Sequence, residues 1–69
     1  YQLGLRIAWA ESLMRLHKLS EAAVQAEIIL RNNPNEFKSH YIMGAIAYSR
    51  KDYEKAYVHA EKVLLLNPS

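Results

Sequence analysis

The chain has no cysteine, and glycine and proline occur only twice each among its 69 residues. The lack of cysteine excludes a disulfide framework and zinc sites of the cysteine-rich kind. It leaves the location of the protein open, with a reducing compartment such as the cytoplasm favoured. No apolar run approaches the roughly 18 residues of a membrane-spanning helix, so we expect no membrane span.

An excess of charge of one sign is lacking too. Residues 1–34 hold four basic and three acidic side chains, and residues 35–69 hold five and four, so each part contributes +1 to the net charge of +2. No basic cluster is available to neutralise a phosphate backbone. We therefore predict that nucleic acid is not a partner of this chain.

What the chain does contain is an internal repeat, whose period is the step from Pro34 to Pro68. These two prolines close segments of the same pattern, AAVQAEIILRNNP at residues 22–34 and AYVHAEKVLLLNP at residues 56–68. Self-similarity at such a period is typical of proteins built from stacked repeats. We accordingly divide the chain into residues 1–34 and 35–69. The residues that recur in register are Ala22/Ala56, Val24/Val58, Ala26/Ala60, Glu27/Glu61, Leu30/Leu64, Asn33/Asn67 and Pro34/Pro68.

Helical periodicity runs through both repeats and predicts helices over residues 3–16, 20–32, 36–50 and 53–66. Ser20, Asn35 and Asp52 are the expected N-caps of the last three, and neither proline can continue a helix. Because the connections are short, consecutive helices must run antiparallel. The expected fold class is all-α, with two stacked helix-turn-helix hairpins.

Residues 43–68 resemble a tetratricopeptide repeat. That family has a large apolar residue followed by glycine, an aromatic residue after a short loop, alanine three residues later and a closing proline. These places hold Met43, Gly44, Tyr53, Ala56 and Pro68 here, and, in the looser first repeat, Trp9, Ala10, Leu19, Ala22 and Pro34. The resemblance implies a right-handed α-solenoid. Its small residues let the helices of a hairpin approach closely, while Leu19 and Tyr53 fill the space between hairpins.

The chain is short for such an array, since about 60% of the unfolded surface is buried at this length and three repeats are normally needed for stability. It begins at Tyr1 without a methionine and stops one residue after Pro68, at a repeat boundary. We therefore expect a segment of a longer array.

The chain departs from the family pattern at two kinds of position. Early in the first helix of each repeat, Arg6 and His40 stand where the family usually has tryptophan or leucine. In each second helix, alanine precedes the bulky residue instead of following it. We interpret this inversion as a compensated exchange of volume, because it occurs twice, as Ala26 then Ile29 and as Ala60 then Val63.

No set of residues predicts catalysis or metal binding. No two of the three histidines stand three or four residues apart, and no carboxylate pair completes a metal set on one helix. We interpret His17, His40 and His59 as a loop, a packing and a surface residue. Ser39 and His40 point about 100° apart on a helix, so they do not form a nucleophile and base. We predict that the chain is not an enzyme and has no catalytic residue, metal or cofactor.

The resemblance also implies a function. In tetratricopeptide arrays, the first helix of each hairpin lines a concave groove that holds a peptide or helix of a partner protein. The corresponding residues here are Ile7, Glu11, Met14, Arg15, Lys38, Tyr41, Ala45, Tyr48 and Ser49. Tyr41 and Tyr48 share a helix face and either belong to the core or stand exposed in this groove. We expect a non-catalytic scaffold in which Tyr41, Tyr48 and Met14 supply apolar contact and Arg15, Lys38 and Glu11 set the register.

Two narrower alternatives concern the partner. Members of the family that grip acidic tails of heat-shock chaperones use a clamp of lysine, arginine and asparagine, of which only Lys38 is present, so a mixed apolar and polar ligand suits the groove better. The alternative to peptide binding is a structural segment that stacks on further repeats or self-associates through uncapped ends. Its contact residues would be Val63, Leu64, Leu65 and Leu66.

Overall fold

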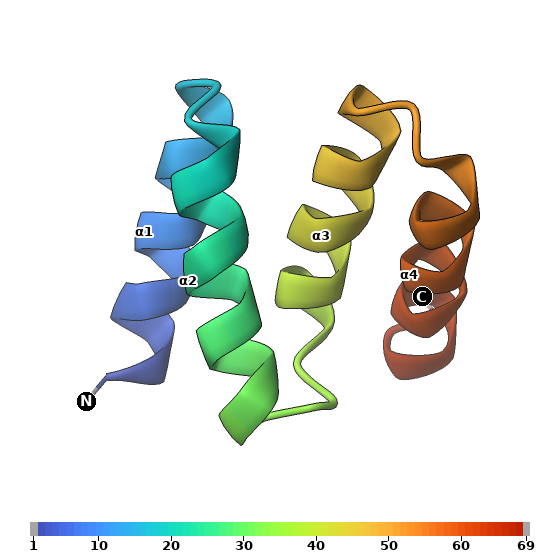
Figure 1. Ribbon diagram of the computed structural model, residues 1–69. Coiled ribbons are helices and arrows are strands. Elements are labelled where there is room, and N and C mark those ends of the chain that lie inside the picture. Colours follow the sequence, from blue (N-terminus) through green and yellow to red (C-terminus); the bar gives the residue numbers. More distant parts are fainter. Residues whose placement is uncertain (1, 69) are drawn as a thin grey trace.

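The computed structural model describes residues 2–68, and all the regular structure within them is α-helical. The helices are α1 (Leu3–Arg15), α2 (Leu19–Asn32), α3 (Phe37–Ser49) and α4 (Tyr53–Leu66). They form two antiparallel hairpins side by side, α1 with α2 and α3 with α4 (Figure 1). The all-α prediction is confirmed, and the predicted helix ends agree with the observed ones to within one residue.

Of the three predicted N-caps, only Asp52 is confirmed. Its Oδ1 accepts a hydrogen bond from the backbone N–H of Lys55 at 3.4 Å, at the start of α4. The prediction for Ser20 is wrong, because α2 already begins at Leu19 and Lys18 takes the N-cap position. The Ser20 hydroxyl instead accepts from Nη2 of Arg50 at 3.3 Å and so connects the two hairpins.

The start of α3 is capped by Glu36, and not by Asn35 as predicted. Pro34 and Asn35 lie in a turn, so the extended residue that enters the helix is Glu36. Its carboxylate accepts from the backbone N–H of Lys38 at 3.3 Å and of Ser39 at 2.8 Å. A carboxylate at this end of a helix is also favoured by the helix dipole.

The turn inside each hairpin has the same backbone conformation. His17 and Lys51, which lie one repeat period apart, both have positive φ angles, 60° and 63°. At each turn two backbone N–H groups bond back to the last carbonyls of the preceding helix, in the pattern of a Schellman motif. The residues before the prolines agree as well, with φ of −139° at Asn33 and −144° at Asn67. The repeat seen in the sequence therefore extends to the backbone.

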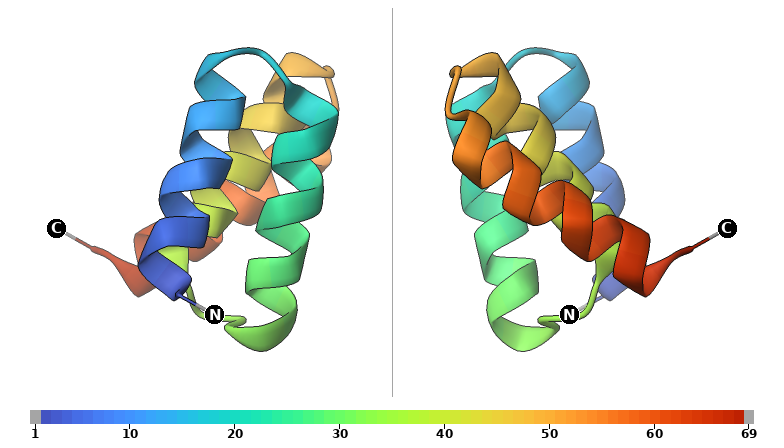
Figure 2. Two further views of the ribbon diagram at one scale, coloured as in Figure 1. Left: turned by 90° about the vertical axis from the view of Figure 1, so that its left-hand side faces the viewer. Right: turned by 90° about the vertical axis from the view of Figure 1, so that its right-hand side faces the viewer.

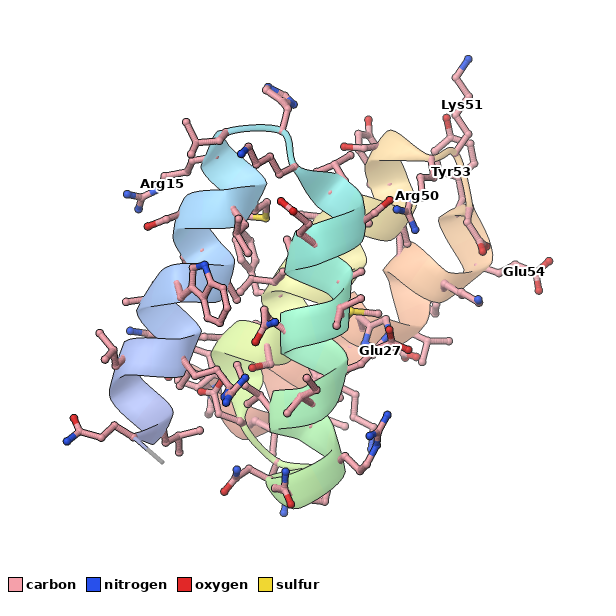
Figure 3. All side chains as sticks on the ribbon, turned by 60° about the vertical axis from the view of Figure 1, so that its left-hand side comes forward. Arg15, Glu27, Arg50, Lys51, Tyr53 and Glu54 are labelled. Carbon is pink, nitrogen blue, oxygen red and sulfur yellow. The ribbon has the colours of Figure 1, made fainter. Side chains whose placement is uncertain are left out.

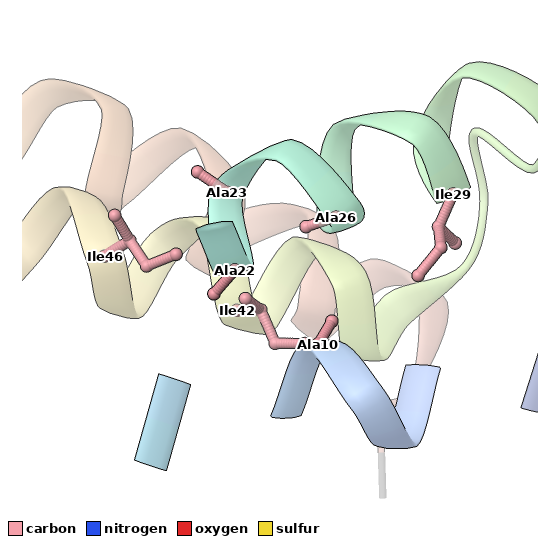
Figure 4. Close-up of a cluster of buried hydrophobic side chains, with 7 residues drawn as sticks. All are labelled: Ala10, Ala22, Ala23, Ala26, Ile29, Ile42 and Ile46. Atoms are coloured by element: carbon pink, nitrogen blue, oxygen red, sulfur yellow. The ribbon is translucent and has the colours of Figure 1, made fainter. Parts of the chain in front are cut away.

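The buried core lies among α1, α2 and α3. Small residues on α1 and α2 let α3 approach closely, and Ile42 and Ile46 of α3 point into the space that results (Figure 4). Burying one such side chain contributes roughly 1.5–3 kcal/mol. The members of this cluster are Ala10, Ala22, Ala23, Ala26, Ile29, Ile42 and Ile46.

Helix α4 is covered least. It lies on the far side of α3 from the first hairpin (Figure 2), and among the helices of residues 2–68 it packs only against α3. None of its residues is buried. The close approach expected at Gly44 is observed here, since a Cβ added to Gly44 would lie 3.2 Å from Cβ of His59 and 3.6 Å from the carbonyl oxygen of Ala56.

The two residues expected between hairpins have different surroundings. Leu19 packs against the buried cluster. Tyr53, its counterpart in the second repeat, is exposed, and its ring meets the ring of Tyr48 edge-on with the centroids 5.7 Å apart.

Candidate functional site

A groove of about 440 Å³ lies between α3 and α4. Small residues of both helices form its floor. Tyr41 and Tyr48 also line it, with 56% and 67% of their surface exposed. The groove is almost entirely apolar, with His40 as its single ionisable residue besides the two tyrosines. Its lining is His40, Tyr41, Gly44, Ala45, Tyr48, Ala56, Ala60, Val63 and Leu64. We call this surface the α3/α4 groove.

The five candidate residues on α3 are divided by this groove. Tyr41, Ala45 and Tyr48 line it together, opposite α4. Lys38 and Ser49 are exposed outside it. Of the two positions considered for the tyrosines, core or exposed surface, the structure has both rings at the surface.

The four candidate residues on α1 lie elsewhere. Ile7 and Met14 are half-buried and pack against the buried cluster that α3 completes. Glu11 is half-buried as well, and Arg15 points away from the molecule at the end of α1 (Figure 3). The structure thus joins three of the α3 candidates to α4 in one groove, while the α1 candidates do not line it.

A second feature of the site is a pair of histidines beneath the groove. His40 is buried, and its Nδ1 lies 3.0 Å from Nδ1 of His59, with the ring centroids 5.2 Å apart. Nε2 of His40 lies 2.8 Å from the carbonyl oxygen of Pro34. The interpretation of His40 as a packing residue and of His17 as a loop residue is confirmed. That of His59 as a surface residue is wrong, because α4 turns it toward His40.

These contacts determine which nitrogens carry protons. The Pro34 carbonyl can only accept, so Nε2 of neutral His40 donates to it and Nδ1 of His40 is left as an acceptor. His59 then donates through its own Nδ1. Burial lowers the pKa of His59, and the neighbouring His40 and Lys55 lower that pKa further. The neutral form of His59 is therefore the favoured one.

The first hairpin has a polar pair at the equivalent place. Nη1 of Arg6 donates to Oε1 of Gln25 at 2.6 Å. Arg6 and Gln25 each stand one repeat period before His40 and His59, so both repeats connect their helices at the same position. Arg6 and His40 are recognisable in the sequence as departures from the repeat pattern, whereas their partners Gln25 and His59 were not predicted. The signal that reveals these partners is their spacing. Gln25 follows Arg6 at the same separation as His59 follows His40.

The described residues were also compared with the patterns of metal sites, membrane helices and known proteins. Within residues 2–68 no group of three or more histidine, cysteine or acidic side chains is arranged to hold a metal ion. No helix in that part of the chain is long and apolar enough to cross a membrane. A scan against models of protein families, a search of curated proteins and a search of solved structures each find no match.

Proposed function

We propose that this chain is a non-catalytic protein-interaction scaffold that binds a helix or peptide of a partner protein in the α3/α4 groove. The observation that carries the proposal is the groove itself, an open apolar hollow with a volume of about 440 Å³ that is lined by two exposed tyrosines. Apolar concavities with few polar groups are the usual form of binding sites.

The residues of the groove suit a protein ligand. Tyrosine offers a large, rigid ring with a hydrogen-bonding tip and is enriched where interfaces gain most of their affinity. The floor of alanine and glycine lets the backbone of a ligand come close. Lys38, exposed on α3 beyond the tyrosines, adds a charge that can set the direction of the ligand.

We further propose that the two hairpins stack in the right-handed manner of tetratricopeptide repeats. Support comes from the repeat period, which recurs in the sequence, in the φ angles of both turns and in the polar pairs of both hairpins. In this arrangement, Ile7, Glu11, Met14 and Arg15 would extend the ligand surface along α1.

Selection from a displayed peptide library against the 69-residue chain tests the proposal. We expect selected peptides to lose at least tenfold in affinity for the double variant Tyr41→Ala/Tyr48→Ala. The matched control is Val24→Ala/Val58→Ala, which truncates two exposed apolar side chains outside the groove and should leave affinity unchanged. Failure to select any peptide, or equal affinity for both variants, contradicts peptide binding at this groove.

A second candidate function is stacking or self-association through the two ends of the helix stack, α1 and α4. An apolar surface on α1 favours it. A hollow along the outer face of α1 is lined by Gln2, Leu5, Arg6, Ala8, Trp9 and Ser12. At the opposite end, Val63 and Leu66 are half-buried and Leu64 and Leu65 exposed. Sedimentation equilibrium separates the two functions, since stacking requires a mass that increases with concentration and peptide binding requires none.

A further inference from the structure

The floor of the α3/α4 groove repeats a surface that is already occupied within the chain. In the first hairpin, Ala10, Ala22, Ala26 and Ile29 are fully buried. One repeat period later in the sequence stand Gly44, Ala56, Ala60 and Val63, and all four line the α3/α4 groove. The groove is thus the counterpart of the seat that α1 and α2 offer to α3.

What occupies the first seat is visible in the same molecule. Helix α3 packs against both α1 and α2, and Ile42 and Ile46 are buried in the contact. These isoleucines are four residues apart, so they lie on one face of the helix, one turn from each other. The contact is close because small residues of α1 and α2 face the two large branched side chains of α3.

We propose that the α3/α4 groove binds an amphipathic helix of a partner protein that presents two large aliphatic residues four positions apart, in the pose of α3 on the first hairpin. The inference rests on the proposed function and adds the chemistry of the ligand. The observation behind it is the residue-by-residue match between the occupied seat and the exposed one.

A second copy of the chain fits this description poorly. The helix that it would present is α1, whose outer face is exposed. Where α3 has Ile42 and Ile46, α1 has Ala8 and Ser12, which are too small to fill the seat. The residues of the exposed floor are also smaller than those of the buried one, because Gly44 replaces Ala10 and Val63 replaces Ile29. The small residues of α1 would therefore leave a void above this floor. A void at a packed contact loses both burial and dispersion energy.

The probe for the proposal is a labelled peptide with the sequence of residues 36–50, added to the 69-residue chain and followed by fluorescence anisotropy. We expect saturable binding. A peptide with Ile42→Ala and Ile46→Ser, which carries the residues of α1 at these two places, should bind at least tenfold more weakly. Equal binding of the two peptides overturns the inference about the ligand and leaves the proposed function standing.

Two variants of the chain assign the site. Ala60→Phe adds a ring to the exposed floor of the groove and should weaken the peptide at least tenfold. Ala8→Phe, the same change at an exposed alanine of α1, should leave affinity unchanged, and circular dichroism checks that both variants remain helical. Binding that ignores Ala60→Phe means that the peptide displaces α3 from the first hairpin, which overturns the proposal.

Two further outcomes are informative. If neither this peptide nor any library peptide binds, the proposed function fails together with the inference. If the chain itself associates with increasing concentration and Ala60→Phe prevents this association, the groove belongs to a second copy and a partner helix is excluded as its occupant.

Discussion

The two hairpins share one pattern of residues and differ in what covers them. Ala26 and Ile29 of α2 are fully buried, whereas their counterparts on α4, Ala60 and Val63, are exposed and half-buried. The chemistry of the positions does not cause the difference. Val24 and Val58, which match in the same way, are 51% and 53% exposed. Burial at the other positions depends on α3, which covers the first hairpin, whereas within residues 2–68 no helix covers the second hairpin in this way.

This comparison separates stability from binding along the chain. The positions beneath α3 contribute to folding, because their apolar surface is removed from water in the chain itself. The same positions in the second hairpin contribute little to folding and remain available to a ligand. Substituting matched residues in the two hairpins tests this division directly.

The largest effect is expected for truncation of the buried floor. Ile29→Ala should lower the free energy of unfolding by about 2–5 kcal/mol, because a fully buried side chain is removed and a cavity remains. Val63→Ala should cost about 1 kcal/mol, since the side chain is half-buried and a fully buried methylene is worth about 0.8 kcal/mol. Denaturation with urea measures both. Similar losses would mean that α4 is as well covered as α2.

Replacing a small residue of the floor by a larger one should also cost more stability in the first hairpin than in the second. Ala26→Phe overpacks the core and should cost about 1–3 kcal/mol. Ala60→Phe meets open space in the groove, and a surface substitution of this kind changes stability by only about 0.5 kcal/mol or less. A thermal melt of each variant compares them. A melt of Ala26→Phe that shows no loss of stability would refute the interpretation of Ala26 and Ile29 as a compensated exchange of volume.

The helices of both hairpins could be predicted from the sequence, but the contacts between helices could not, and the reason is physical. Periodicity and the two prolines predict the helices, because these signals act within a few residues. The contact of His40 with His59 joins two different helices and depends on how α3 and α4 cross, so neither helix alone reveals it. The exposure of Tyr41 depends on which helices pack around α3, and the residues of the second repeat alone do not determine that packing.

The polar pairs provide a third contrast, in their response to pH. Because the pKa of His59 is lowered in the folded chain, the unfolded chain binds more protons below the ordinary value of 6.5. The stability that neutral His59 contributes is present above pH 6.5 and is lost as the pH falls below that value. The Arg6–Gln25 pair of the first hairpin contains no histidine.

His59→Gln, which gives the second hairpin the residue of the first, should therefore reduce the fall in stability on mild acidification. Urea denaturation at neutral and mildly acidic pH measures the difference. His17→Asn is the matched control, because His17 is an exposed loop histidine and asparagine tolerates its positive φ. An unchanged pH dependence in His59→Gln would exclude the histidine pair as the origin of acid sensitivity.

The smallest effect is expected where the hairpins do not differ. His17 and Lys51 occupy the same left-handed conformation at exposed turns, which costs a residue with a Cβ about 1–2 kcal/mol. Glycine avoids this strain but loses more entropy on folding, by about 0.5–1 kcal/mol. His17→Gly and Lys51→Gly should each raise the free energy of unfolding by about 0.5–1 kcal/mol, to the same extent in both hairpins. Unequal gains in urea denaturation would show that the covering by α3 also influences the turns, and that the asymmetry of the molecule extends beyond its grooves.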